Sequence, residues 1–173
     1  MKKIHWVLLV VAIVALAGAG YVVSQADSSE TPGQLEVAEA FYDFGTVGLA
    51  NVSHAYTIKN TGSGPLRIRK ISTSCGCTTA MLKMSDGQTE TFSMDHGGTV
   101  PAINIALAPG EEAQVVATYN PLAHGQARAA GTFNRSIYVL TDNPRKEYEL
   151  TFRVQVYPDG ADTEPPRALK SSK

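Results

Sequence analysis

The sequence predicts an all-β domain, an antiparallel sandwich or barrel of short strands. Three observations support this prediction: apolar and polar residues alternate over several segments, turn-forming residues separate these segments, and no stretch after Val23 shows a sustained helical period. Alternation with a period of two buries one face of a strand. Parallel α/β folds, which alternate strands with helices, are therefore poor candidates.

The alternation is clearest at 148–156 and recurs at 52–58, more weakly at 66–68, and at 113–119. Its inward rows include Tyr148, Leu150, Phe152, Val154 and Val156, then Val52, His54, Tyr56 and Ile58, then Leu66 and Ile68, and finally Ala113, Val115, Ala117 and Tyr119. Phe133, Ile137 and Val139 form a further row. Turn signals separate these runs as NTGSGP at 60–65, APGEE at 108–112, NPLAHG at 120–125 and TDNP at 141–144. Several short strands are expected.

Residues 1–26 are predicted to be a signal peptide or a signal anchor that forms a hydrophobic helix. Lys2 and Lys3 precede an uncharged apolar run from Trp6 to Val23, which is typical of export segments. The small-x-small sequence at 24–26 suits cleavage, whereas the length of the run suits an uncleaved membrane span. Both alternatives place the rest of the chain outside the cytoplasm, secreted or membrane-anchored.

The remaining chain divides into a linker at 27–34, a folded domain at 35–157 and a disordered tail at 158–173. The linker is small and polar and contains Pro32 and Gly33. The tail carries several prolines and few apolar residues, so it lacks the surface needed to form a core.

The charge balance and the motifs argue against nucleic-acid binding and against an enzyme. Without Lys2 and Lys3, the 15 basic residues fall to 13 against 16 acidic ones, and no basic stripe with interleaved aromatics occurs. The sequence has no G-x-S-x-G elbow and no glycine-rich phosphate loop. A thiol nucleophile at Cys75 or Cys77 is the catalytic option that stays open.

Cys75 and Cys77 are the only cysteines, and Gly76 separates them. Residues two apart in an extended strand have Cα atoms about 6.6 Å apart, too far for an easy disulfide. Glycine backbone freedom at position 76 would let the chain curl and bring the sulfurs together. Three alternatives stay open: two buried thiols, a local disulfide of the labile kind, or a pair of metal ligands.

The metal alternative rests on the soft ligands that follow the cysteine pair. These are Met81, Met84, Met94 and His96. Thiolate, thioether and imidazole together suit copper(I). Without such a site no cofactor is predicted. His124 falls in a turn and is expected to be exposed.

Four ordered motifs resemble a known family: YDFGTV at 42–47, the segment 52–78 ending in SCGCT, APGEEAQVVATYNP at 108–121 and GTFNRSIYVLTDNP at 131–144. They are similar to the bacterial domain-of-unknown-function family 1573, which is related to the immunoglobulin-like domains of Hydin and major sperm protein. The resemblance implies an immunoglobulin-like β-sandwich outside the cytoplasm and brings no established activity. The stretch 81–107 is longer here than the family pattern.

The sequence thus favours an extracytoplasmic immunoglobulin-like module that binds a protein or a cell-envelope component, or acts as a scaffold, with an unknown partner. An exposed sheet edge or the loop 84–101 would provide the contact. The alternative function is a redox-active or copper(I)-handling protein that uses Cys75 and Cys77, with membrane association through the amino-terminal segment if it is uncleaved. A plain structural spacer is a further alternative.

Overall fold

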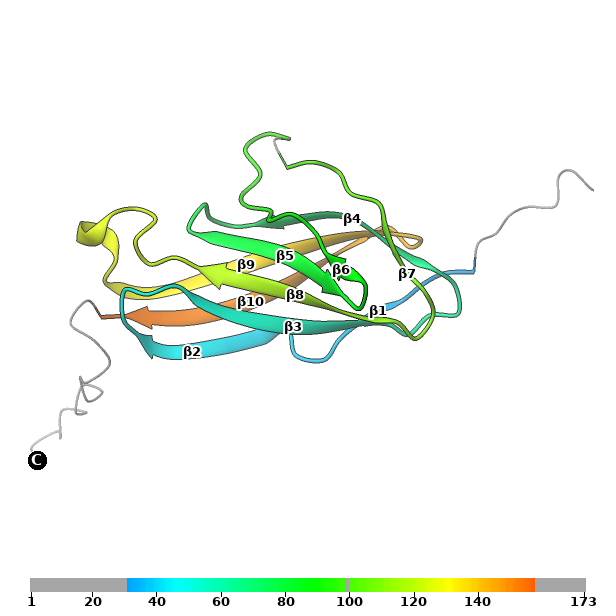
Figure 1. Ribbon diagram of the computed structural model, residues 1–173, viewed down its shortest axis with the longest axis horizontal. Helices are drawn as coiled ribbons and strands as arrows, with labels where there is room; N and C mark the ends of the chain where they lie inside the picture. The colour runs from blue at the N-terminus through cyan, green and yellow to red at the C-terminus, as the bar shows by residue number, and fades with distance from the viewer. Residues whose placement is uncertain (1–30, 99, 158–173) are drawn as a thin grey trace, which may run out of the picture. The chain divides into compact units, whose positions relative to one another are not determined.

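β-Strands make up most of the described chain. The computed structural model describes residues 31–98 and 100–157 (Figure 1). Its strands are β1 (Leu35–Val37), β2 (Phe41–Val47), β3 (Val52–Asn60), β4 (Leu66–Thr73), β5 (Thr78–Met84), β6 (Gly87–Gln88), β7 (Ile105–Leu107), β8 (Glu112–Tyr119), β9 (Gly131–Asp142) and β10 (Lys146–Val156), with one short 3₁₀ helix, η1 (Gln126–Arg128). The all-β prediction is confirmed for these residues.

The strands form two five-stranded sheets that face each other. The first sheet has the order β1-β3-β8-β5-β6 and the second the order β2-β10-β9-β4-β7. The chain changes sheets between β1 and β2, and β2 then pairs with β10 in parallel. The fold is therefore a sandwich with one parallel pair, whereas the sequence led us to expect antiparallel pairing throughout.

One hydrophobic core lies between the sheets, as the alternation predicted. Leu150, Phe152, Val154 and Val156 of β10 are buried, and Tyr56 and Ile58 of β3 face them from the other sheet. The Tyr56 hydroxyl donates a 2.8 Å hydrogen bond to the Thr151 carbonyl, which joins the two sheets. Burying each large apolar side chain contributes about 1.5 to 3 kcal/mol.

In β4 the inward-facing positions shift part-way along the strand. Leu66 and Ile68 are buried, but the next buried side chain is Ile71. The pairing with β9 changes register between Ile68 and Lys70. Such a bulge inserts an extra residue and changes which side chains face inward. This is why the predicted alternation faded after residue 68.

The described residues of the insertion 85–104 lie along one side of the sandwich, where some of them pair with strands and many stay exposed. β6 pairs with the end of β5, and Phe92 exchanges backbone hydrogen bonds of 2.7 and 2.8 Å with Ala80. Further along, Thr73 of β4 donates its N–H to the Ser93 carbonyl at 3.2 Å. Phe92 is only 3% exposed and belongs to the core. The segment thus bridges the edges of both sheets above β5 and β4 (Figure 1).

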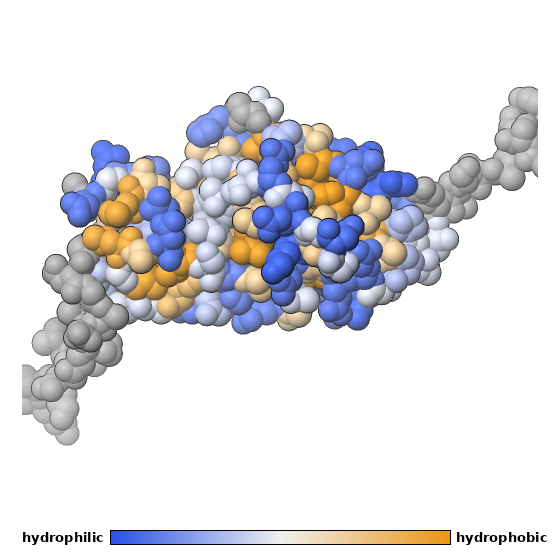
Figure 2. All heavy atoms as spheres, in the orientation of Figure 1, coloured by the Kyte–Doolittle hydropathy of each residue, from blue (hydrophilic) through white to orange (hydrophobic). Residues whose placement is uncertain are grey.

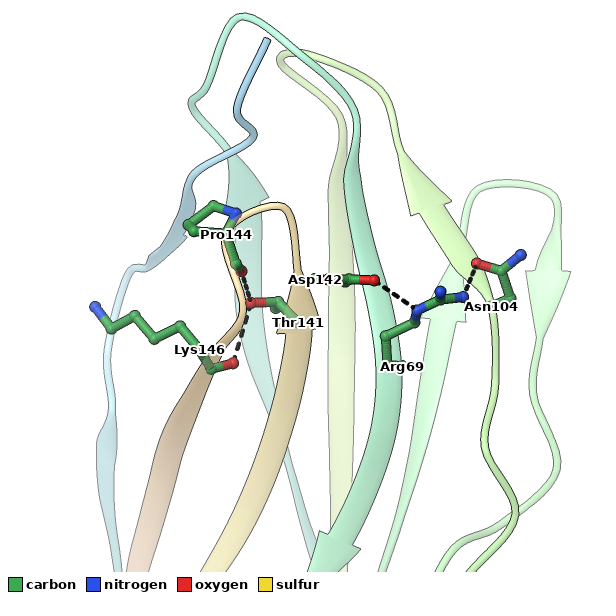
Figure 3. Close-up of polar contacts among 6 residues, drawn as sticks. All are labelled: Arg69, Asn104, Thr141, Asp142, Pro144 and Lys146. Carbon is green, nitrogen blue, oxygen red and sulfur yellow. Dashed lines mark hydrogen bonds and ion pairs between the residues drawn. The ribbon is translucent and has the colours of Figure 1, made fainter. Parts of the chain in front are cut away.

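Side chains of the second sheet hold the far end of the insertion (Figure 3). Arg69 on β4 donates a 3.1 Å hydrogen bond from Nε to Asp142 on β9 and a 2.7 Å bond to Asn104. Nearby, the buried Thr141 hydroxyl lies 3.1 Å from the carbonyl oxygens of Pro144 and Lys146, which closes the β9–β10 turn. The Arg69 charge is thus matched by a neighbouring carboxylate.

Within 31–98 and 100–157, no helix has the length and apolar character needed to cross a bilayer. The predicted hydrophobic helix at 1–26, the first half of the linker at 27–30 and the tail at 158–173 lie outside the described residues.

Candidate functional site

Two regions of the sandwich carry features suited to function: an unpaired side and the cysteine turn. The unpaired side, formed by β2 and the first half of β3, lies opposite the insertion (Figure 1). In the described chain, β2 has only β10 as a neighbour, and β1 pairs with β3 only from Ile58 to Asn60. One edge of β2 and one edge of β3 at 52–56 therefore carry no strand partner.

An aromatic cluster closes the gap between these two edges. The ring of Tyr42 stacks on the ring of His54 with a centroid distance of 3.6 Å, and Phe44 meets both rings edge-on. Phe44 also contacts Phe152 of the core at 5.2 Å. Phe41, at the start of β2, is 51% exposed. Partly exposed aromatic side chains beside free strand edges are typical of protein-binding surfaces.

The cluster changes the acid-base behaviour of His54. Burial lowers the pKa of the imidazole below its ordinary 6.5, and the negative charge of Glu39 opposes this shift. The predicted inward orientation of His54 agrees with its place in the stack. His54 is therefore a neutral packing residue near neutral pH.

The cysteine turn connects β4 of the second sheet to β5 of the first. The Thr78 N–H donates to the Cys75 carbonyl at 3.0 Å, which defines a β-turn over 75–78. Cys75 and Cys77 form a disulfide with their Cα atoms 5.2 Å apart. Gly76 does not use the left-handed backbone region, and no atom lies within 4 Å of where its Cβ would be. The expectation that special glycine angles close the turn is therefore wrong, because an ordinary turn shortens the Cα separation.

Each sulfur has a basic side chain beside it. His124 Nε2 lies 3.4 Å from Cys75 Sγ, and Arg135 donates from Nε to Cys77 Sγ at 3.1 Å. Cys75 is half-buried, whereas Cys77 is only 3% exposed. The two sulfurs of one disulfide thus differ in access and in partner.

The β8–β9 connection brings His124 to the disulfide. The Asn120 N–H donates to the Cys77 carbonyl at 2.9 Å, and the Asn120 side chain accepts a 2.9 Å bond from the Leu122 N–H. The Gly125 N–H then donates to the Leu122 carbonyl, also at 2.9 Å. These bonds fold residues 120–125 over the end of the sandwich next to the cysteine turn. Leu122, in the same turn, is 40% exposed.

In the dithiol state, Cys75, Cys77 and His124 offer three ligands for a metal ion. In the disulfide form shown here, their sulfur and nitrogen atoms lie within 4.8 Å of one another. Among the described residues, these three form the cluster of His, Cys, Asp or Glu side chains that is close enough to hold a metal ion. Two thiolates and an imidazole suit zinc or copper(I).

Two of the other predicted copper ligands, Met81 and Met84, lie on β5. Met81 pairs with Val116 inside β5, and Met84 pairs with Gly87 at the end of β5 remote from the cysteine turn. Met94 bridges to Thr73 through the backbone, and His96 is exposed in the insertion. Met81 and Met84 thus belong to β5, whereas the sequence pattern placed them in the long insertion.

Sequence reasoning did not identify His124 and Arg135 as site residues. His124 lies 49 residues after Cys75, and Arg135 lies 58 residues after Cys77. Only the packing of the strands brings each pair together. In the sequence, the only indication for His124 is that it lies in a turn that follows a predicted strand.

The comparisons confirm the family resemblance for part of the chain. The family described as "Protein of unknown function (DUF1573)" matches residues 35–94, from β1 into the insertion. The motifs at 108–121 and 131–144 lie beyond the matched range. No curated protein matches the chain.

Solved structures resemble this chain at low sequence identity. A protein of unknown function from Porphyromonas gingivalis is 16% identical with a TM-score of 0.52, and the match covers 75% of this chain but 50% of that one. The ASH/PapD-like domain 7 of human CEP192 is 13% identical with a TM-score of 0.47, covering 78% and 92% of the two chains. The chaperone YadV is 12% identical with a TM-score of 0.43, covering 76% and 55%. At such identities the likeness concerns the fold alone.

Proposed function

We propose that this chain, which matches the DUF1573 family over residues 35–94, is an extracytoplasmic module that binds a protein of the cell envelope through the unpaired side formed by β2 and β3. The main support for this proposal is that the two sides of the sandwich differ in how many of their strand edges are paired. On one side the insertion pairs with β5 and β4 through backbone hydrogen bonds and the buried Phe92, and the strands that end the sheets there, β6 and β7, have only 2 and 3 residues. The other side keeps two free strand edges with aromatic side chains between them.

The chemistry of the unpaired side suits an extended segment of a partner protein. Free backbone groups of an edge strand pair with an added strand, and side chains beside the edge supply specificity. Phe41 is half-exposed at the start of β2 and would act as an apolar anchor, while Tyr42 and His54 stack between the two edges. Gly45 has a positive φ where the pairing of β2 with β10 shifts register, and Asp43 adds a charge, so both limit indiscriminate pairing along this edge.

The proposed location rests on the amino-terminal pattern and on the disulfide. Lys2 and Lys3 before an apolar run favour export, and disulfides persist mainly in oxidising compartments. A phosphatase that is active only outside the cytoplasm, fused after Lys173, is expected to be active in cells. Removal of residues 6–23 should abolish this activity, and an inactive fusion of the full chain would contradict export.

Binding is tested with a photo-crosslinking amino acid placed at the exposed position 43 in the cells that make the protein. Light should produce one discrete adduct with another protein. The same amino acid at the exposed Gln88, on the covered side, serves as the control and should produce none.

Surface variants then test the anchor. Phe41→Glu should reduce the adduct from position 43 about tenfold, because buried interface aromatics carry much of the binding energy. Leu122→Glu adds the same charge at the other exposed apolar residue and should leave the adduct unchanged. Equal adducts from positions 43 and 88, or an adduct insensitive to Phe41→Glu, would refute binding at this side.

A further inference from the structure

We propose that the Cys75–Cys77 disulfide is a thiol–disulfide exchange site that oxidises a dithiol, with Arg135 and His124 as the groups that act on its sulfurs. This activity is separate from binding at the unpaired side and draws on different residues. The evidence for it is that the two sulfurs differ in access and that Arg135 and His124 each lie beside one of them.

The incoming thiolate is directed to Cys75. Thiol–disulfide exchange requires the attacking sulfur to reach one sulfur of the bond from the far side of the other. Cys77 is 3% exposed and has Thr78 at its sulfur, whereas Cys75 is half-buried at the surface of the turn. Access alone therefore selects Cys75 Sγ as the atom attacked and Cys77 as the leaving sulfur.

Arg135 is placed to stabilise the leaving thiolate. Its Nε donates to Cys77 Sγ at 3.1 Å, while another guanidinium nitrogen donates to the Asn134 carbonyl at 2.8 Å and the group lies 5.1 Å above the Phe133 ring. These contacts hold the guanidinium before any charge forms on the sulfur. Among the described residues no carboxylate pairs with Arg135, so its positive charge is not neutralised by an ion pair. A nearby cation favours a thiolate and so speeds its departure.

His124 serves the other sulfur. Its Nε2 lies 3.4 Å from Cys75 Sγ, and the imidazole is exposed in the turn 120–125. The Cys77 N–H also points at Cys75 Sγ, at 3.2 Å. Together these two groups stabilise negative charge on Cys75 when it departs in the second step. The imidazole can then deliver a proton to that sulfur.

The reaction balances as a two-electron transfer. A substrate thiolate attacks Cys75 Sγ, a substrate–Cys75 bond forms, the Cys75–Cys77 bond breaks, and Cys77 leaves as a thiolate. The second thiolate of the substrate attacks the substrate sulfur of this mixed disulfide and expels Cys75. The substrate dithiol becomes a disulfide, the protein becomes a dithiol, and the two substrate protons end on the protein thiols or the solvent.

The surroundings favour a dithiol carried by a protein. Leu122 is 40% exposed in the same turn as His124, and Figure 2 shows hydrophobic atoms gathered at the end of the domain that contains η1. Apolar surface beside the accessible sulfur suits the flanking side chains of a peptide better than a small hydrophilic thiol.

The test measures reduction of the oxidised protein by dithiothreitol under anaerobic conditions, followed by acid quench, alkylation and mass analysis. The wild type should be reduced rapidly while folded. Arg135→Gln should slow the reaction about tenfold, because hydrogen bonds to charged groups are the strong ones. Arg128→Gln removes an exposed arginine of η1 and should have no effect. Thermal unfolding of each variant checks that the fold is kept.

Single-cysteine variants assign the two sulfurs. In Cys77→Ser the free Cys75 should react with an aromatic disulfide reagent at least about tenfold faster than the free Cys77 of Cys75→Ser, because thiol reactivity follows exposure. His124→Gln should slow reduction of the wild-type disulfide, and mixed disulfide should accumulate.

Three outcomes would overturn the proposal. The first is a disulfide that dithiothreitol reduces only when the protein is unfolded, which would make it structural. The second is a reduction rate that Arg135→Gln and His124→Gln leave unchanged. The third is a protein that is purified as a dithiol with zinc or copper bound to Cys75, Cys77 and His124. That result would make the cysteine turn a metal site. None of these outcomes bears on crosslinking from position 43.

Discussion

Arg135 on β9 donates a hydrogen bond from Nε to Sγ of Cys77 over 3.1 Å, although 58 residues separate the two in the chain. The contact exists because the cysteine turn crosses from β4 to β5 at the same end of the sandwich at which β9 begins. A guanidinium and a disulfide sulfur are thus held together by strand pairing rather than by local sequence.

Phe92→Ala should lower the free energy of unfolding by about 3 kcal/mol, because it leaves a cavity in the core. Phe92 is 3% exposed and anchors the insertion across β5. Urea unfolding followed by circular dichroism measures the change. The matched control is Phe41→Ala at a 51% exposed position, which should stay within about 0.5 kcal/mol of the wild type. Equal effects from both variants would show that the insertion is not part of the core.

Gly76→Ala should leave both the disulfide and the stability unchanged. The site has space for a Cβ and does not use a left-handed backbone conformation. Gly64→Ala is the contrasting variant, because its Cβ would lie 1.6 Å from the Thr31 carbonyl oxygen. We expect that clash to cost about 1 to 3 kcal/mol. Thiol quantification and thermal unfolding check both variants, and loss of the disulfide in Gly76→Ala would contradict the turn geometry.

Stability should fall as the pH drops below the ordinary histidine pKa of 6.5. Burial lowers the pKa of His54 in the folded state, so the unfolded chain takes up its proton first. The contribution of neutral His54 is therefore present above about pH 6.5 and is lost as the pH falls through the folded pKa. Urea midpoints between about pH 7.5 and about pH 5.5 measure the slope. In His54→Phe, which keeps an aromatic ring against Tyr42, this part of the slope should disappear.

Asp95 should titrate far below an ordinary carboxyl. Its pKa is lowered from 3.8 to about 2, mainly by the hydrogen bond from Lys70 and further by the N–H groups of Gly98 and Val100, while burial opposes the shift. The stabilisation is therefore present above about pH 4 and is lost as the pH falls toward 2.

NMR titration of the Asp95 carboxyl provides the measurement, together with amide exchange of Gly98. The protection of the Gly98 amide relative to an unstructured amide should fall as Asp95 takes up its proton. Lys70→Gln should move the midpoint back toward 3.8, and a normal midpoint in the wild type would refute the Lys70–Asp95 pair.

The fold class and the positions of the long strands follow from the order of residues alone. Residues 148–156, 113–119 and 52–58 keep a strict period of two, and each lies in a strand with one buried face. Local alternation suffices there because the side-chain direction of a strand follows directly from residue spacing. The sequence also identified Cys75 and Cys77 as the chemically distinctive pair.

The surroundings of that pair, and the side of the sandwich on which β2 and β3 keep free edges, depend instead on how the strands pack. His124, Arg135 and the parallel pairing of β2 with β10 depend on contacts between distant segments, which a period-two pattern does not encode. The burial of Phe92 in the insertion could not be predicted either, because the residues around it do not alternate between apolar and polar. Phe92 is buried because its backbone pairs with Ala80 of β5. Strand identity is local in a sheet protein, whereas strand neighbours are set by the global burial of apolar surface.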